Sequence, residues 1–130
     1  MALELESLRK SVEALGRAVR SAEGLGEADP DLRETVRAGV IQNFEVAYEI
    51  SWKFMKRWIE VHVGATQVDG VTRRELFRQA AENRLIEDVD GWMRHHHARN
   101  LTSHTYDAGV ADEVFGEAPR LLEDARALLS

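Results

Sequence analysis

The 130-residue sequence contains no cysteine and only two prolines. The absence of cysteine excludes disulfide bonds and thiol nucleophiles, and it fits a reducing compartment. No apolar run approaches the roughly 20 residues that a membrane-spanning helix needs. The acidic N-terminus lacks the basic start typical of a signal peptide. We therefore expect a cytoplasmic protein without a membrane partner.

Positively charged residues are also in the minority. The sequence has 17 Lys and Arg against 23 Asp and Glu, which gives a net charge of −6. Such a chain is not suited to coating nucleic acid non-specifically, so we expect no DNA partner and only a local site for any RNA. The residues that are abundant, Ala, Leu, Glu and Arg, favour helices. The length is that of one domain, and we predict a single domain over residues 1–130.

Apolar residues recur at helical spacing in five segments, which predicts five helices. The third begins with the capping box Thr72-Arg73-Arg74-Glu75, the fourth has Asp88 as its cap, and Pro119 kinks or splits the fifth. The expected helices cover about residues 3–22, 31–62, 72–81, 89–100 and 109–129. Short connections between them predict an all-α, up-and-down bundle of four to five antiparallel helices.

The longest predicted helix is apolar around much of its circumference, since Val46, Ile50 and Val61 lie outside its main stripe. We interpret this pattern as an intramolecular core plus a subunit interface, and so expect a homodimer. The alternative is a central helix in a monomeric bundle.

Three consecutive histidines, His95, His96 and His97, suggest a metal site at first sight. Neighbouring residues on a helix point about 100° apart, so three in a row do not converge on one ion. We predict no metal and no cofactor here. We expect His96 at the edge of the core and the other two histidines in solvent.

The most informative segment places a cation, an amide, an imidazole and a phenol within eight residues, Arg99-Asn100-Leu101-Thr102-Ser103-His104-Thr105-Tyr106. Histidine can take a proton from a ribose 2′-hydroxyl or give one to a leaving 5′-oxygen. Arginine can stabilise charge on phosphorus, and Asn100 could orient the phosphate or the histidine. The alternative is a helix-end arginine bound to carbonyls and a loop histidine.

The spacing limits how Arg99 and His104 can meet. On one continuous helix, five residues separate them by about 140°. They converge only if the helix ends between them or if a second copy supplies one of the pair. Tyr106 has two open interpretations, a ring packed on the bundle or an exposed phenol that positions RNA or accepts a nucleotidyl group.

This segment through Asp107, the block from Val40 to Lys53, the Thr72–Glu75 helix start and Trp92 together resemble the nucleotidyltransferase substrate-binding family. This family is a branch of the HEPN superfamily that includes HepT-type toxins. The resemblance covers about residues 5–129. It implies a dimeric helical bundle that forms a complex with a separate small nucleotidyltransferase, the antitoxin.

The resemblance further implies that Arg99 and His104, with Asn100 as polar neighbour, carry metal-independent endoribonuclease activity in a cleft shared by two copies. The substrate would be RNA, either tRNA or mRNA. Tyr106 would be the residue that the partner adenylylates to silence the ribonuclease. The alternative function is a non-catalytic subunit that presents a substrate, or itself, to the nucleotidyltransferase.

Overall fold

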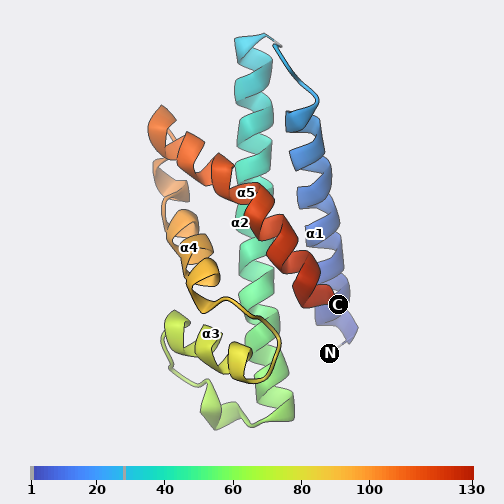
Figure 1. Ribbon diagram of the computed structural model, residues 1–130, viewed down its shortest axis with the longest axis vertical. Coiled ribbons are helices and arrows are strands. Elements are labelled where there is room, and N and C mark those ends of the chain that lie inside the picture. The colour runs from blue at the N-terminus through green and yellow to red at the C-terminus, as the bar shows by residue number, and fades with distance from the viewer. Residues whose placement is uncertain (1, 28) are drawn as a thin grey trace.

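The computed structural model describes residues 2–27 and 29–130, with side chains described from residue 5 onwards. Within these residues it contains helices only (Figure 1). The five α-helices are α1 (Ala2–Glu23), α2 (Pro30–His62), α3 (Arg73–Glu82), α4 (Val89–Asn100) and α5 (Ala108–Leu129). Two short 3₁₀ turns, η1 (Ala65–Gln67) and η2 (Thr102–His104), follow α2 and α4.

The long helix α2 is the central helix of the bundle, and each of the other four helices packs against it. Figure 1 shows α1 antiparallel to α2, α5 crossing α2 towards α1, and the short α3 near the C-terminal end of α2. The predicted all-α, up-and-down bundle is therefore confirmed. No helix in the described part of the chain has the length and apolar content required to span a membrane.

The core follows the predicted stripes. Leu8 and Leu15 of α1, Phe44 and Met55 of α2, and Leu121 of α5 have no exposed surface. Each side chain of this size stabilises the folded state by about 1.5–3 kcal/mol when fully buried. Trp92 and Ala98 of α4 belong to the same core, so the packing of the core also positions the polar segment that follows α4.

Local signals placed the helix starts correctly. The Thr72 hydroxyl accepts a hydrogen bond from the Glu75 amide at 3.1 Å, and Asp88 accepts one from the Gly91 amide at 3.0 Å. Each such cap contributes about 1 kcal/mol. Pro119 lies inside α5 and does not split it, because buried neighbours on both sides, Ala118 and Leu121, hold the helix on the core.

His95 is not in solvent, and that prediction is wrong. The residue is 1% exposed, because α4 packs against α5 as well as against α2 and α3. Its Nε2 lies 2.6 Å from Asp124 Oδ2 and its Nδ1 lies 2.6 Å from Glu117 Oε2. The second contact is close but lacks the geometry of a hydrogen bond. His96 is half-buried and His97 is exposed, as predicted.

Candidate functional site

Helix α4 ends between Arg99 and His104, which is one of the two conditions for their convergence. Its last turn closes with the Leu101 amide donating to the carbonyls of His97 and Ala98 at 3.2 and 3.0 Å. The turn η2 then carries the chain to His104. Even so, no hydrogen bond or ion pair joins these two side chains within the described part of the chain.

Arg99 is held by α2 rather than by helix-end carbonyls. Its Nε donates to Glu49 Oε1 at 3.0 Å, and its Nη1 donates to the Thr102 hydroxyl at 2.9 Å. Glu45 Oε2 lies 3.5 Å from Nη2. The guanidinium thus has two carboxylates beside it and remains 30% exposed. Its position is fixed, but its charge is more than balanced within one chain.

His104 and Tyr106 both lie on the surface. Tyr106 is 87% exposed, so its ring does not pack on the bundle. The two rings meet edge to face with centroids 6.1 Å apart. The His104 ring is exposed, and among the described side chains its contact is with the Tyr106 ring. Both groups are open to a ligand or to another protein.

Asn100 lies at the end of a polar contact chain that the sequence did not predict. Its Nδ2 is 3.5 Å from His96 Nε2, and His96 Nδ1 is 2.8 Å from the Tyr48 hydroxyl. Arg73 donates to that hydroxyl at 3.2 Å and stacks on the Trp52 ring at 3.6 Å. These contacts join α2, α3 and α4.

Burial shifts the pKa values of the two titratable groups in this series of contacts, Tyr48 and His96. Burial raises the pKa of the Tyr48 phenol to about 12, which keeps it protonated. Burial, and then the nearby Arg73 charge, lower the pKa of His96 below its ordinary value. Sequence reasoning missed Tyr48 and Arg73 as site residues because their contacts cross between helices, from α2 to α4 for Tyr48 and from α3 to α2 for Arg73. The local signals were that Tyr48 and Glu49 belong to the family-like block on the long helix and that Arg73 belongs to the family-like helix start Thr72–Glu75.

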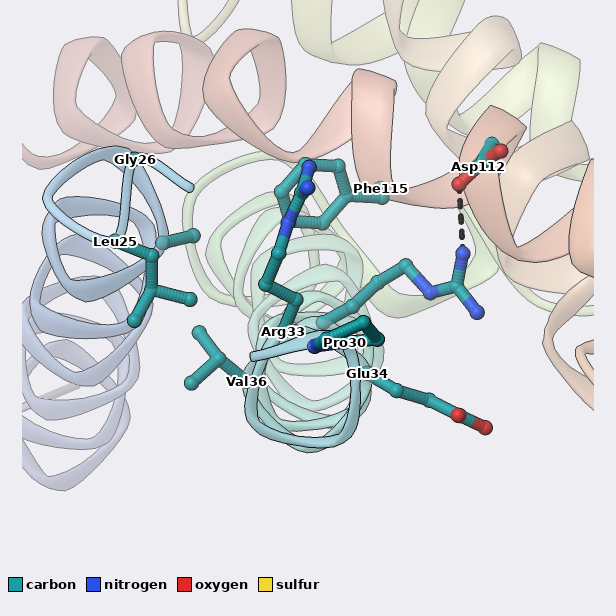
Figure 2. A pocket seen from close by; sticks show the side chains of 10 residues that line it. Leu25, Gly26, Pro30, Arg33, Glu34, Val36, Asp112 and Phe115 are labelled. Atoms are coloured by element: carbon teal, nitrogen blue, oxygen red, sulfur yellow. Dashed lines mark hydrogen bonds and ion pairs between the residues drawn. The ribbon is translucent and has the colours of Figure 1, made fainter. Parts of the chain in front are cut away.

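A cavity of about 290 Å³ adjoins the polar segment and is lined in part by Arg37, Glu45, Thr102 and Thr105. It shares Arg37 with a larger cavity of about 500 Å³ at the turn between α1 and α2. In the larger cavity, Arg37 is paired with Asp112 at 2.7 Å (Figure 2). None of the predicted site residues lines either cavity, but the smaller one is lined by Thr102 and Thr105 of the polar segment and by Glu45, which contacts Arg99.

The consecutive histidines lie in three different surroundings, the α5 carboxylates, the Tyr48 hydroxyl and the surface. In the described part of the chain, no group of three or more His, Cys, Asp or Glu side chains is arranged to hold a metal ion.

Together, the fold and the segment define a small helical-bundle protein with a polar site at the end of its fourth helix. Residues 3–130 match the family described as nucleotidyltransferase substrate binding protein like, and the chain belongs to this family. The resemblance seen in the sequence is thereby confirmed.

Individual relatives support the same assignment. The chain is 33% identical over 99 residues to a Haemophilus influenzae protein named probable ribonuclease HepT, with 75% of this chain and 68% of the relative aligned. The chain is also similar to a Haemophilus influenzae structure described as revealing the fold of a substrate-binding domain of a nucleotidyltransferase. The two chains are 30% identical, with a TM-score of 0.89 and 96% of both chains covered.

A crystal structure from Thermus thermophilus shares the fold at lower similarity. Its TM-score is 0.75 at 22% identity, with 94% of this chain and 95% of that chain covered.

Proposed function

We propose that this protein is the substrate-binding HEPN subunit of a two-component nucleotidyltransferase system, and that it acts as a metal-independent endoribonuclease. In this proposal residues 1–130 work as one domain in the cytoplasm, on tRNA or mRNA. The family assignment and the relative named probable ribonuclease HepT support it. Within the chain, the support is that Arg99, Asn100 and His104 lie together around the end of α4.

The chemistry needs only RNA and these side chains. A base removes the proton of a ribose 2′-hydroxyl, the 2′-oxygen forms a bond to phosphorus, and the bond from phosphorus to the 5′-oxygen breaks. The leaving 5′-oxygen takes a proton from an acid, which leaves a 2′,3′-cyclic phosphate and a 5′-hydroxyl. His104 is the proposed proton-transfer group. Arg99 and Asn100 are the proposed donors to the charged phosphate oxygens.

One chain alone does not complete this site, because Arg99 is bonded to α2 carboxylates and does not contact His104. We propose that a homodimer brings His104 of one copy to Arg99 of the other. Exposed apolar side chains on and just after α2 support a subunit interface there. Val46 is 41% exposed, Val61 is 53% exposed and Val63 is 49% exposed.

The exposure of Tyr106 beside His104 is the single observation that carries the regulatory part of the proposal. The separate nucleotidyltransferase, the antitoxin, would catalyse attack of the Tyr106 oxygen on the α-phosphorus of a nucleoside triphosphate. The new bond joins the phenol oxygen to phosphorus, pyrophosphate leaves, and the phenolic proton passes to a base of the partner. The added phosphate then occupies the space beside His104 with negative charge and excludes RNA.

A second candidate function is a non-catalytic subunit that presents a substrate, or itself, to the nucleotidyltransferase. The observation in its favour is electrostatic. Glu45 and Glu49 outnumber the Arg99 charge that they contact, and the chain carries a net charge of −6. A phosphate would meet repulsion at such a site.

One experiment separates the two functions. Purified unmodified protein is incubated with bulk tRNA in EDTA, as wild type and as His104→Ala, and mass spectrometry checks that Tyr106 carries no nucleotide. Cleavage by the wild type alone supports the ribonuclease. No cleavage by either protein, together with stable binding to the nucleotidyltransferase, supports the non-catalytic subunit.

A further inference from the structure

The Tyr48 hydroxyl lies between Arg73 of α3 and His96 of α4, at 3.2 Å and 2.8 Å. Tyr48 itself is fully buried. Arginine can only donate, so the hydroxyl accepts from Arg73. The phenolic proton then needs an acceptor of its own, because a buried donor without one costs about 1–3 kcal/mol. Among the described residues, His96 Nδ1 is the acceptor in reach.

This arrangement determines which ring nitrogen of His96 carries the proton. If Nδ1 accepts from the phenol, it carries no proton, and the neutral ring holds its single proton on Nε2. The neutral form also agrees with the lowered pKa of His96, which burial and the Arg73 charge cause. The Nε2–H group faces Asn100, whose side-chain amide lies 3.5 Å away.

An amide nitrogen facing Nε2–H would place two donors against each other. A half turn of the Asn100 amide exchanges its oxygen and nitrogen within the same volume, so the oxygen accepts from His96. We propose that Tyr48 and His96 are positioning residues that fix the Asn100 amide, with its oxygen towards His96 and its NH₂ group directed to the phosphate of the RNA.

The inference rests on the proposed function, since it assigns Asn100 a donor role at the same site. Arg73 begins the sequence of hydrogen bonds and is itself immobilised by its stacking on Trp52. A preorganised donor stabilises charge that develops in the transition state without reorganising at that moment. The contacts from α2 and α3 therefore supply the orientation that Asn100, exposed at the end of α4, lacks on its own.

The first test is the protonation site of His96 in the unmodified full-length chain. Long-range ¹⁵N–¹H NMR of the histidine rings distinguishes Nδ1–H from Nε2–H, and loss of one ring's signals in His96→Gln assigns the residue. The expected result is a proton on Nε2 in the wild type and a mixture of both forms in Tyr48→Phe. A proton on Nδ1 in the wild type, or an unchanged His96 signal in Tyr48→Phe, overturns the proposal.

Ser51→Ala is the matched control, because it also removes one buried hydroxyl from α2. Ser51 donates to the Ala47 carbonyl at 2.7 Å and has no part in the contacts of His96. The His96 signal is expected to stay at Nε2–H in this variant.

Cleavage kinetics supply the functional measurement. Asn100→Ala is expected to lower kcat about a hundredfold, the lower end of the range for losing one preorganised donor. Tyr48→Phe is expected to lower kcat about tenfold with little change in KM. The double variant should lose no more than Asn100→Ala alone, because both changes remove the same interaction. Additive losses overturn the inference.

The two proposals fail separately. A wild type without ribonuclease activity but with His96 protonated on Nε2 overturns the ribonuclease function and supports the hydrogen-bond order. An active wild type with His96 protonated on Nδ1 supports the ribonuclease function and overturns the positioning role.

Discussion

His95 and His104 lie nine positions apart in the sequence and have opposite surroundings. His95 is 1% exposed and has a carboxylate oxygen 2.6 Å from each ring nitrogen. His104 is exposed, and its ring contacts only the edge of another exposed ring, Tyr106. A histidine buried between two carboxylates contributes to the fold and has no surface open to a substrate. One with free nitrogens contributes little to stability and is available for chemistry.

His104→Gln is expected to show the largest effect, on activity alone. Loss of a proton-transfer group lowers cleavage about 10²–10⁴-fold. The free energy of unfolding should stay within about 0.5 kcal/mol of the wild type, because the ring is exposed. Cleavage rates and urea denaturation measure the two quantities. His97→Gln, also an exposed histidine, is the control, and equal activity loss in both variants would contradict the assignment.

His95→Ala is expected to lower the free energy of unfolding by about 3–5 kcal/mol, because it removes the buried partner of the Glu117 carboxylate and leaves it only the exposed Arg120 at 3.3 Å. Urea denaturation measures the change, with His97→Ala as control. A loss below about 1 kcal/mol would show that His95 does not hold α4 to α5. Residual ribonuclease activity in the folded fraction would be expected, since His95 has no role in the proposed chemistry.

Asp124→Asn tests the more exposed side of the same cluster. The Asp124 side chain is 39% exposed, so water already screens part of its interaction with His95. An amide oxygen can still accept from the ring nitrogen. The expected loss is therefore about 1 kcal/mol, clearly smaller than that of His95→Ala. Thermal denaturation of both variants side by side gives the order, and the reverse order would contradict it.

His96 is half-buried, between the buried His95 and the exposed His104. Its replacement is expected to change the stability least of these variants, by an amount that depends on pH. Burial lowers its pKa in the folded state below the ordinary value, so folding disfavours its proton. Its contribution to stability is present above the unfolded pKa and is lost as the pH falls through the folded pKa. His96→Gln should therefore lose less stability than the wild type between neutral and mildly acidic pH. Denaturation at a series of pH values measures this, and parallel curves would argue against it.

The sequence predicted those parts of the fold that depend on near neighbours. Thr72 and Asp88 accept from amides three residues ahead, so their caps are visible in the sequence itself. The apolar stripes likewise follow from helical spacing, and they were sufficient for the bundle. His95 was misplaced because its burial depends on α5, whose carboxylates come 22 and 29 positions later.

The candidate site likewise has a part that the sequence predicted and a part that it did not. The segment from Arg99 to Tyr106 was recognised because its residue types are contiguous. The contacts of that segment and its neighbours were not predicted. Arg99 donates a hydrogen bond to Glu49, fifty positions earlier in the sequence. His96 contacts the Tyr48 hydroxyl, forty-eight positions earlier. No spacing rule predicts such contacts, because they depend on how α2, α3 and α4 pack.

By itself, the sequence determined the helices, their caps, their buried faces and the polar segment at the end of α4, because each depends on residues within a few turns. Only the tertiary structure decided which histidine is buried between carboxylates, which is joined to Tyr48 and which remains free. The physical reason is that burial and hydrogen bonding depend on side chains from other helices, and packing of the whole core brings them together.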